Sequence, residues 1–232
     1  MTFRGGNLVG CLTESFGGRS LVLRFGFGMI VRGAVLAGGE SQRMGRDKAF
    51  LRHPRGGRPL WERQVDVVAG LGVEEVFVSI GTGTEWEMVL EGARGDLRFL
   101  RDEDDGKGPL EGIYRVMGAR PDSWLVLLAV DLPAMRTETL QKRLHLAEEK
   151  GQAVIPWYRG YWEPVAGVWA PSIYPLVRKA REEGRLGLQG LLTEAEAEGL
   201  VLRSPVEAEE EEDFRNVNTR EEWAAFARGV GP

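Results

Sequence analysis

Hydrophobic residues recur along this 232-residue chain in two alternating patterns. Short runs rich in Val, Ile and Leu are separated by stretches in which apolar residues return at helical spacing, as at Leu60, Val65, Val68 and Leu71. The longest run, Trp124–Val130, is apolar throughout, which is typical of a central strand buried on both faces. This alternation predicts an α/β fold with a doubly wound, mostly parallel sheet and helices on both of its faces.

The predicted elements lie between residues 30 and 203. The predicted strands are Ile30–Leu36, Glu75–Ile80, Leu97–Arg101, Trp124–Val130, Ala153–Trp157, Trp162–Trp169 and Leu200–Arg203. The predicted helices are Leu60–Leu71, Leu110–Ala119, Thr137–Lys150 and Ser172–Glu183. We expect Thr137 to be the N-cap of the third helix and Gly151 to follow its end. The acidic run Glu207–Asp213 is expected to be a solvated surface loop without chemistry.

Residues 1–28 follow neither pattern. Glycines cluster there, and Glu14 together with these glycines interrupts any apolar stretch that would suit a signal peptide. We therefore expect residues 1–28 to be a disordered or dispensable extension, with a structured hairpin as the alternative. Residues 29–232 are long enough to form a single domain with a good core, and we expect them to do so.

The composition narrows the classes of function. Hydrophobic residues make up 43% and charged residues 28% of the chain, as in ordinary globular proteins. No run approaches the roughly eighteen apolar residues that a membrane span needs. The net charge of −5 does not favour a broad nucleic-acid surface. One cysteine, Cys11, excludes an intramolecular disulfide framework and fits a reducing compartment. We therefore expect a cytoplasmic protein that binds neither membrane nor nucleic acid.

The stretch LAGGESQRMGRDK, Leu36–Lys48, directly follows the first predicted strand. In a doubly wound sheet, ligands bind beyond the carboxyl ends of the strands. Gly38 and Gly39 allow the backbone to approach a ligand closely, and successive N–H groups in such a loop bind anions. Arg43 can form forked contacts with phosphate oxygens, while Lys48 supplies a compact positive charge. The spacing fits neither a P-loop nor a dinucleotide fingerprint, and a glycine-rich turn with basic surface residues is the alternative.

Two further predicted strands end at a carboxylate. Asp102 follows Leu97–Arg101 and Asp131 follows Trp124–Val130, at the same edge of the sheet as the glycine loop. Mg²⁺ prefers oxygen ligands and is usually held by one or two carboxylates together with substrate phosphates. A phosphate loop and a metal carboxylate together indicate a nucleotide site. The alternatives are that Asp131 is a capping residue between this strand and the helix that begins near Thr137, and that Asp102 is simply solvated.

At this point the residues resemble a known family. The pattern Leu36-Ala37-Gly38-Gly39-x-Ser41-x-Arg43-Met44-Gly45-x-Asp47-Lys48 is similar to the signature of nucleotidyltransferases with a glycosyltransferase-A-like sheet. Within that superfamily it most resembles the molybdenum cofactor guanylyltransferases. Three weaker motifs stand in the right order: Gly108-Pro109-Leu110-Glu111-Gly112, Asp131-x-Pro133 and Asn216-Val217-Asn218-Thr219. The resemblance covers Met29 to about Ala227, and only the N-terminal extension lies outside it.

The resemblance implies a reaction and a set of residue roles. The enzyme would transfer GMP from GTP to the phosphate of molybdopterin, with Mg²⁺ as cofactor, and molybdopterin-delivery proteins or molybdoenzyme chaperones are implied partners. Leu36, Ala37, Gly38 and Gly39 would contact the nucleotide. Lys48, Asp131 and Arg43 would be catalytic, with Lys48 on the phosphates and Asp131 on Mg²⁺ and nucleotide. Asp102 would also bind the nucleotide. The residues expected to shape the site or face the pterin are Gly108, Gly112, Asn216 and Asn218.

One departure and two alternatives accompany this interpretation. Some family members carry a nucleotide-contacting asparagine after the second strand, whereas this chain reads Val78-Ser79-Ile80, so a nucleotide contact at Ser79 is not implied. The nearest alternative is a cytidylyltransferase acting on molybdopterin or on a sugar or polyol phosphate. An alternative of another class is a nucleotide-binding regulator without turnover.

Overall fold

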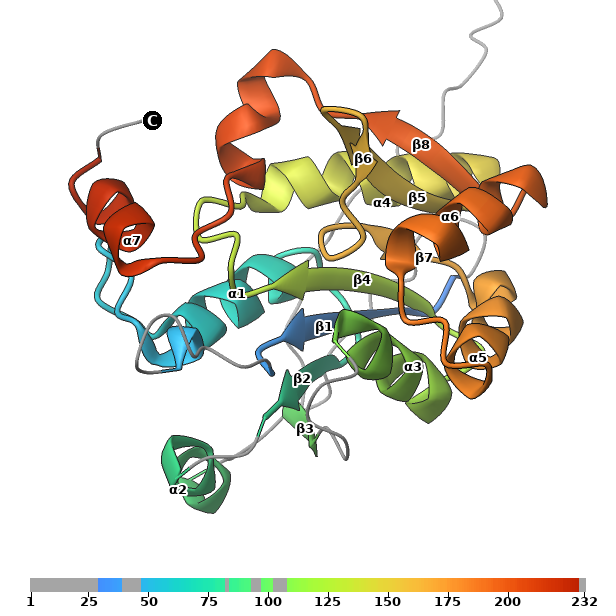
Figure 1. Cartoon of the computed structure of the whole chain (residues 1–232). Coiled ribbons are helices and arrows are strands. Elements are labelled where there is room, and N and C mark those ends of the chain that lie inside the picture. The colour runs from blue at the N-terminus through green and yellow to red at the C-terminus, as the bar shows by residue number, and fades with distance from the viewer. Residues whose placement is uncertain (1–28, 39–46, 82–83, 93–96, 102–107, 230–232) are drawn as a thin grey trace, which may run out of the picture.

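The structure is a computed structural model that describes residues 29–38, 47–81, 84–92, 97–101 and 108–229. Figure 1 shows a twisted central sheet with helices packed on both of its faces. The expectation about residues 1–28 falls outside the described residues, as do the predicted site residues Gly39, Arg43 and Asp102. No helix of the described ranges is long and apolar enough to cross a membrane.

Eight strands of the described chain form one sheet, in the order β3-β2-β1-β4-β7-β5-β6, with β8 paired to β5. Their bounds are β1 Val31–Leu36, β2 Val76–Ile80, β3 Leu97–Arg101, β4 Trp124–Ala129, β5 Ala153–Tyr158, β6 Tyr161–Trp162, β7 Val168–Trp169 and β8 Val201–Pro205. Strands β1 to β4 pair in parallel, and β8 is parallel to β5. Strand β7 is antiparallel to both β4 and β5. The predicted α/β fold with a mostly parallel sheet is therefore confirmed.

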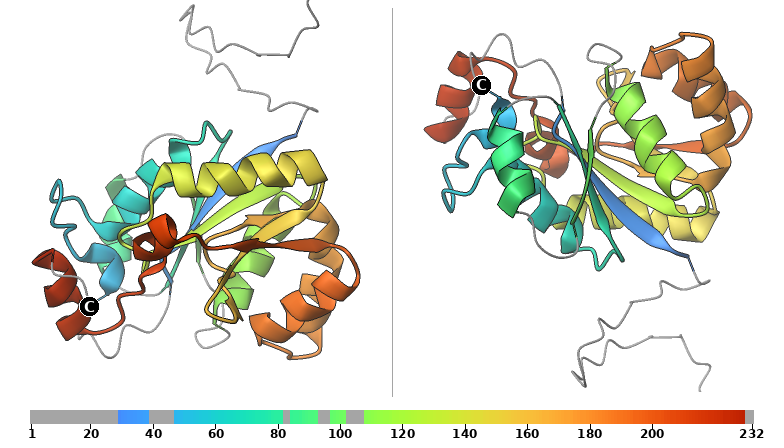
Figure 2. Two further views of the ribbon diagram at one scale, coloured as in Figure 1. Left: turned by 90° about the horizontal axis from the view of Figure 1, so that it is seen from above. Right: turned by 90° about the horizontal axis from the view of Figure 1, so that it is seen from below.

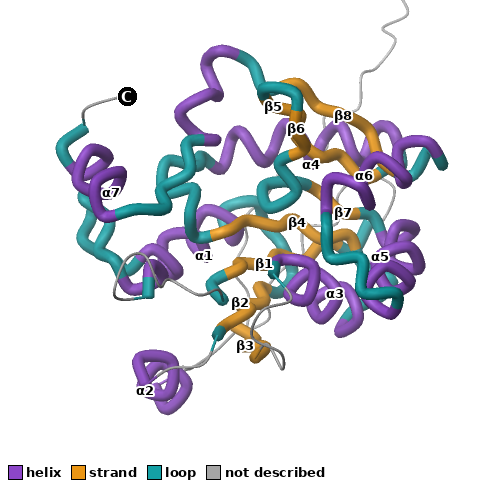
Figure 3. Tube along the Cα trace, in the orientation of Figure 1, coloured by secondary structure: helices purple, strands orange, loops and turns teal. Residues whose placement is uncertain are grey.

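Helices cover the sheet in two layers, which Figure 2 shows from above and below and Figure 3 marks by element type. The described helices are α1 Leu60–Ala69, α2 Thr84–Gly92, α3 Pro109–Ala119, α4 Thr137–Lys150, α5 Tyr174–Glu182, α6 Leu188–Ala197 and α7 Arg220–Ala227. Short 3-10 helices are η2 Lys48–Phe50, η3 Pro171–Ile173 and η4 Ala208–Phe214. One core joins α1 and α4 to the sheet, and a second core joins α3, α5 and α6 to its other face.

The alternation of side chains along β4 explains why both faces carry a core. Val126 and Leu128 belong to the core under α1 and α4, whereas Leu125 and Leu127 belong to the core under α3, α5 and α6. Successive residues of a strand point to opposite faces, so a continuous apolar run is needed where both faces are covered. The prediction of a central, doubly buried strand is confirmed.

Several predicted boundaries differ from the structure. The predicted strand Trp162–Trp169 is wrong as a single element, because residues 163–167 separate β6 from β7. Pro164 lies in this break and has no backbone N–H to donate to a sheet ladder. Thr137 is the first residue of α4 rather than its N-cap, and its hydroxyl donates to Val67 O at 3.1 Å. Gly151 does end α4 in the left-handed conformation, with φ 65°.

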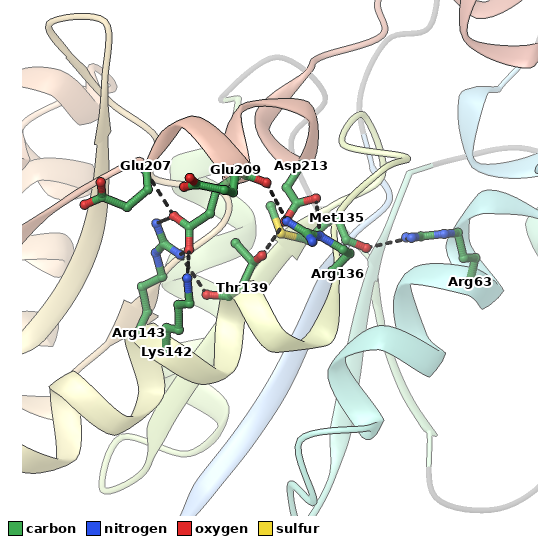
Figure 4. Close-up of polar contacts among 10 residues, drawn as sticks. Arg63, Met135, Arg136, Thr139, Lys142, Arg143, Glu207, Glu209 and Asp213 are labelled. Atoms are coloured by element: carbon green, nitrogen blue, oxygen red, sulfur yellow. Dashed lines mark hydrogen bonds and ion pairs between the residues drawn. The ribbon is translucent and has the colours of Figure 1, made fainter. Parts of the chain in front are cut away.

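The acidic run Glu207–Asp213 is not a solvated loop, and that prediction is wrong. It forms η4, in which Glu210 and Asp213 are buried, each 2% exposed. Figure 4 shows Lys142 and Arg143 of α4, and Arg136 just before this helix, projecting toward η4. We call the side chains of Arg136, Lys142, Arg143, Glu210 and Asp213 the α4–η4 clamp.

The clamp is a connected set of ion pairs. Arg143 Nη1 donates to Glu210 Oε1 at 2.8 Å, and Lys142 Nζ donates to the same oxygen at 3.0 Å. Arg136 Nε donates to Asp213 Oδ1 at 2.8 Å. Burial raises the pKa of Glu210, but hydrogen bonds from Arg143 and Lys142 outweigh burial and lower the pKa to about 2. The clamp fixes the chain just before it enters the Asn216–Thr219 segment.

Neutralising Glu210 should therefore destabilise the fold in a pH-dependent way. Glu210→Gln leaves the buried Arg143 guanidinium without its counter-charge, and we expect a loss of about 3 kcal/mol in the free energy of unfolding at pH 7. The folded-state pKa lies below the ordinary value of 4.5. The stabilisation is thus present above pH 4.5 and is lost as the pH falls toward 2. Urea unfolding at pH 7, 4 and 3 should show the gap between wild type and variant closing.

The matched control is Glu211→Gln, which changes an exposed carboxylate on the same 3-10 helix. We expect it to shift the free energy of unfolding by less than about 0.5 kcal/mol. Equal stability of Glu210→Gln and Glu211→Gln at pH 7 would contradict the role of the clamp.

Candidate active site

The carboxyl ends of β1, β2 and β4 are joined by backbone hydrogen bonds. Ala37 N and Gly38 N both donate to Ser79 O, at 2.8 and 2.9 Å, and Val130 N donates to Leu36 O at 3.1 Å. The start of the glycine loop is thereby held against the ends of both neighbouring strands. This is the edge of a doubly wound sheet where ligands bind.

Helix α3 approaches this edge closely. A Cβ atom at Gly112 would lie 2.8 Å from Leu36 Cδ2 and 3.1 Å from Ser79 Oγ, so only glycine fits without displacement. Gly108, one turn earlier, has φ 61° and precedes Pro109 at the start of the helix. Each glycine of this motif is therefore explained by the backbone: Gly112 by the close approach of α3 to the site edge, and Gly108 by its positive φ. The Ser79 side chain is buried against α3 rather than exposed at the edge.

Lys48 connects the glycine loop to the C-terminal motif. Asp47 accepts hydrogen bonds from Ala49 N at 3.0 Å and from Trp86 Nε1 at 2.9 Å, which fixes the start of η2. The Lys48 ammonium donates to Asn218 Oδ1 at 2.8 Å and to Val217 O at 3.3 Å. Two predicted motifs that lie about 170 residues apart in the sequence thus meet at one ammonium group.

Asp131 lies at the end of β4 beside the same C-terminal segment. Its backbone oxygen accepts a hydrogen bond from Val217 N at 2.9 Å. Its carboxylate oxygen Oδ1 is buried and has no hydrogen-bond partner among the described residues. Burial raises the pKa of the Asp131 carboxyl, and the positive charge of Lys48 opposes that shift.

The backbone around Asp131 is braced from α1. The fully buried Gln64 donates through Nε2 to Ala129 O at 3.0 Å and to Leu132 O at 2.8 Å. Arg63, beside it on α1, donates to Met135 O at 2.6 Å, a contact that Figure 4 also shows. Sequence reasoning placed this helix but did not single out Gln64. The signal available in the sequence was the position of Gln64, which lies at helical spacing on the same face as Leu60 and Val68.

A second carboxylate, Glu163, was missed by sequence reasoning. It is half-buried at the start of the break between β6 and β7. Burial, followed by the negative charge of Asp131, raises the pKa of Glu163 to about 7. The negative charge of Asp131 therefore acts on the Glu163 carboxyl. The break signalled by Pro164 was the feature that could have drawn attention to Glu163.

The structure thus unites most of the predicted site and leaves part of it outside the described residues. The residues brought to one edge are Leu36, Ala37, Gly38, Lys48, Gly108, Gly112, Asp131 and Asn218. Asn216 lies in the same C-terminal segment with an exposed side chain. The roles predicted for Gly39, Arg43 and Asp102 fall on residues outside the described ranges.

This arrangement suits a ligand that carries several negative charges together with a divalent cation. Lys48 offers a positive charge to the anion, and the unpartnered Oδ1 of Asp131 offers a hard oxygen to a cation. A buried carboxylate without a partner is unfavourable, and a bound cation would remove that penalty. Within the described ranges, no three His, Cys, Asp or Glu side chains are grouped in a way that could hold a metal ion. A metal that takes one or two carboxylates and completes its shell with phosphates fits this edge.

Comparison with known proteins identifies relatives over most of the chain. The family model described as MobA-like NTP transferase domain matches residues 33–198. A probable molybdenum cofactor guanylyltransferase from Mycobacterium avium (strain 104) is 31% identical over 204 residues, which cover 86% of this chain and 96% of the relative.

Solved structures share the fold. A crystal structure of molybdopterin-guanine dinucleotide biosynthesis protein A from Archaeoglobus fulgidus superposes with a TM-score of 0.66 at 24% identity, covering 85% of this chain and 97% of the other. A Mycobacterium tuberculosis H37Rv protein crystallised in complex with manganese gives a TM-score of 0.60 at 17% identity, covering 87% of this chain and 100% of the other.

Replacing Asp131 by its neutral isostere should stabilise the protein when no divalent cation is present. Asp131→Asn removes a charge from a buried oxygen, and we expect a gain of roughly 1–3 kcal/mol in the free energy of unfolding at pH 7.5. Because the folded-state pKa of Asp131 is raised above 3.8, its charge destabilises the fold only above that pH. The gain should therefore vanish near pH 3.

Chemical denaturation in a chelating buffer at both pH values provides the measurement. Asp122→Asn, which changes an exposed carboxylate just before the opposite end of β4, serves as the control and should leave stability unchanged. A clear loss of stability in Asp131→Asn at pH 7.5 would mean that the carboxylate has a structural partner within the fold. Unchanged stability at both pH values would fit the capping alternative, since Asn caps helices about as well as Asp.

Proposed function

Because the chain belongs to the MobA-like NTP transferase family, we propose that it is a molybdenum cofactor guanylyltransferase. It transfers GMP from GTP to the phosphate of molybdopterin and forms molybdopterin guanine dinucleotide and pyrophosphate. The observation that carries this function is the meeting of Lys48 with Asn218 and Asp131 at the carboxyl edge of the sheet. Similarity to probable guanylyltransferases over 86% of the chain supports the choice of reaction.

The reaction exchanges one phosphoanhydride bond for another. An oxygen of the molybdopterin phosphate attacks the α-phosphorus of GTP and forms a new P–O–P bond. The bond from the α-phosphorus to the oxygen that bridges it to the β-phosphorus breaks, and pyrophosphate leaves with that electron pair. The attacking phosphate monoester is already ionised at neutral pH, because its second pKa is about 6. No protein base is needed, so the enzyme's tasks are positioning and charge neutralisation.

The proposed residue roles follow from these tasks. Lys48 and Arg43 bind the phosphates and offset their charge as the reaction proceeds. The backbone of Leu36–Gly39 and the carboxylate of Asp102 bind the nucleotide. Asn216 and Asn218 face the pterin side, and Asn218 also orients the Lys48 ammonium by its hydrogen bond. Gly108 and Gly112 shape the edge by letting α3 pack close to it.

Asp131 is the proposed protein ligand of Mg²⁺. Its unpartnered Oδ1 oxygen and its position beside Lys48 fit this role. When bound, Mg²⁺ would withdraw negative charge from the phosphate oxygens. The choice of metal is supported by membership of an NTP transferase family and by the related fold that was crystallised with manganese. Molybdopterin-delivery proteins and molybdoenzyme chaperones are the proposed protein partners.

Turnover should require GTP, molybdopterin and Mg²⁺ together. We expect pyrophosphate release from GTP in the presence of all three, with molybdopterin guanine dinucleotide identified by mass spectrometry. CTP, ATP and UTP at the same concentration should give much slower release. Equal or faster turnover with CTP would establish the cytidylyltransferase alternative, and nucleotide binding without any turnover would establish the regulator.

Lys48 should contribute to GTP binding rather than to stability. Lys48→Ala removes one charge-assisted contact, and we expect GTP affinity and turnover to fall by roughly tenfold to a hundredfold. The fold should remain intact because the side chain lies at the site edge, and loss of its hydrogen bonds to Asn218 and Val217 should lower the melting temperature only modestly. Isothermal titration with GTP and Mg²⁺ measures the affinity.

Two control variants separate direct binding from support of the C-terminal segment. Lys150→Ala removes an exposed charge at the far end of α4 and should leave GTP affinity unchanged. Asn218→Ala removes the partner of Lys48 but keeps the ammonium. If Asn218→Ala lowered GTP affinity as much as Lys48→Ala, Lys48 would act only by holding the C-terminal segment.

A further inference from the structure

Trp86 anchors helix α2 close to the glycine loop. Its side chain is 1% exposed, and within the described part of α2 it is the one fully buried residue. The indole ring packs against Phe50, with ring centroids 4.6 Å apart, and against Trp61, with centroids 5.8 Å apart. Helix α2 follows β2, and Phe50 belongs to η2. The Trp86 ring therefore joins the chain that leaves β2 to the chain that follows the glycine loop.

The indole N–H of Trp86 makes one specific contact. Nε1 donates to Asp47 Oδ2 at 2.9 Å. The other carboxylate oxygen, Asp47 Oδ1, accepts from Ala49 N at 3.0 Å and so caps η2. Burial raises the pKa of Asp47, and the two hydrogen bonds together with the charge of Lys48 oppose that shift. The carboxylate is thus held at both oxygens, once within η2 and once from α2.

The residue that follows Asp47 is Lys48, whose ammonium group lies at the site edge. Lys48 is the first residue of η2, so the direction of its side chain depends on the backbone that Asp47 fixes. A single turn of 3-10 helix has few hydrogen bonds of its own, and contacts from other elements must hold it in place. The bond from Trp86 to Asp47 is such a contact. The position of Lys48 therefore depends in part on α2.

Trp61 offers a comparison within the same aromatic cluster. Like Trp86 it is buried, and its ring contacts both Trp86 and Phe99. Its Nε1 atom is also buried, but it has no hydrogen-bond partner among the described residues. The two neighbouring indoles therefore share their apolar packing and differ in the bond to Asp47. Substitution of each by phenylalanine separates the effect of that bond from the effect of packing.

We propose that Trp86 is a positioning residue for the reaction, which orients Lys48 toward the nucleotide phosphates through its hydrogen bond to Asp47. The inference deepens the proposed function and rests on it for the contact between Lys48 and the phosphates. The Trp86 ring itself does not touch the substrate. Its task is to hold the carboxylate beside Lys48 in one place, so that the ammonium has its binding geometry before the nucleotide arrives.

The first test compares Trp86→Phe with Trp61→Phe in the full-length protein. Each variant keeps an aromatic ring and loses one indole N–H from the same cluster, so we expect similar falls in melting temperature. Isothermal titration with GTP and Mg²⁺ should show about tenfold weaker binding by Trp86→Phe, which is the effect of one hydrogen bond to a charged group. Trp61→Phe should bind GTP as wild type does. Equal GTP affinities of the two variants would overturn the proposal.

A double-mutant cycle tests whether Trp86 acts through Asp47. Asp47→Ala should weaken GTP binding at least as much as Trp86→Phe does, because it removes both hydrogen bonds of the carboxylate. Addition of Trp86→Phe to Asp47→Ala should then cause no further loss of affinity, since the bond between the two side chains is already gone. Additive losses would mean that Trp86 acts by another route and would contradict the proposed role.

A spectroscopic measurement observes the bond without any ligand and does not require a folded Trp86 variant. The chain has seven tryptophans, whose indole N–H groups give separate signals in a ¹H–¹⁵N NMR spectrum. A hydrogen bond to a charged carboxylate is short and strong, and its proton resonates at lower field. Asp47→Ala should therefore move one indole signal, that of Trp86, to higher field and the others much less. A spectrum in which no indole signal responds to Asp47→Ala would refute the bond.

Inorganic tripolyphosphate separates this inference from the proposed function. It carries phosphates like those of a nucleoside triphosphate, and its binding with Mg²⁺ depends on neither the base nor the acceptor. Weaker tripolyphosphate binding by Trp86→Phe than by Trp61→Phe, together with absent guanylyl transfer by wild type, would overturn the proposed function alone. Guanylyl transfer by wild type, with equal tripolyphosphate and GTP affinities in the two variants, would overturn the role of Trp86 alone.

Discussion

A carboxylate oxygen buried at the end of a central strand can remain ionised only if positive charge reaches it, because burial strongly disfavours the charged form. Asp131 is in this position, and several surrounding residues stabilise its charge or hold its backbone in place. The Lys48 ammonium opposes the rise in its pKa, Gln64 holds the backbone on both sides, and Val217 N ties its carbonyl to the C-terminal segment. A bound divalent cation would meet the remaining need for positive charge at this carboxylate. In the proposed function the same cation carries the phosphates of the nucleotide, so Asp131 would couple metal binding to nucleotide binding.

The α4–η4 clamp holds the chain that leads to the contacts of Val217 and Asn218 with Asp131 and Lys48. Val217 and Asn218 reach Asp131 and Lys48 only because η4 directs the chain back toward the sheet edge. Arg143 and Glu210 are both buried, so neither can lose its partner without leaving a charge in the core. An apolar contact could also attach η4 to α4, but it would allow η4 to shift along the helix. A bidentate arginine–carboxylate pair fixes one position, and the few residues between Asp213 and Asn218 transmit that position to the site.

The sequence was informative where a local pattern determines the structure. The unbroken apolar run Trp124–Val130 predicts a doubly buried strand. Because the strands are parallel, the residue after this run, Asp131, is expected at the same edge of the sheet as the glycine loop. Gly151 ends α4 because a glycine adopts the left-handed conformation most readily. Prediction failed where the decisive partner is distant in the chain. Glu210 looks solvated until Arg143, 67 residues earlier, is brought beside it. Glu163 was hidden within aromatic and apolar residues that resemble one continuous strand.

The reversed direction of β7 has a consequence for how such sites are assembled. Each parallel strand of the sheet delivers to the site edge the residues that come after it, so the candidate site residues at the ends of β1 and β4 follow their strands. Strand β7 runs the opposite way, and the residues that precede it arrive at that edge instead. Glu163 precedes β7 and comes near enough to Asp131 for the Asp131 charge to act on it. In a sheet that contains one reversed strand, a side chain near the site edge can therefore precede its strand in the sequence, where a search of the residues after each strand does not look.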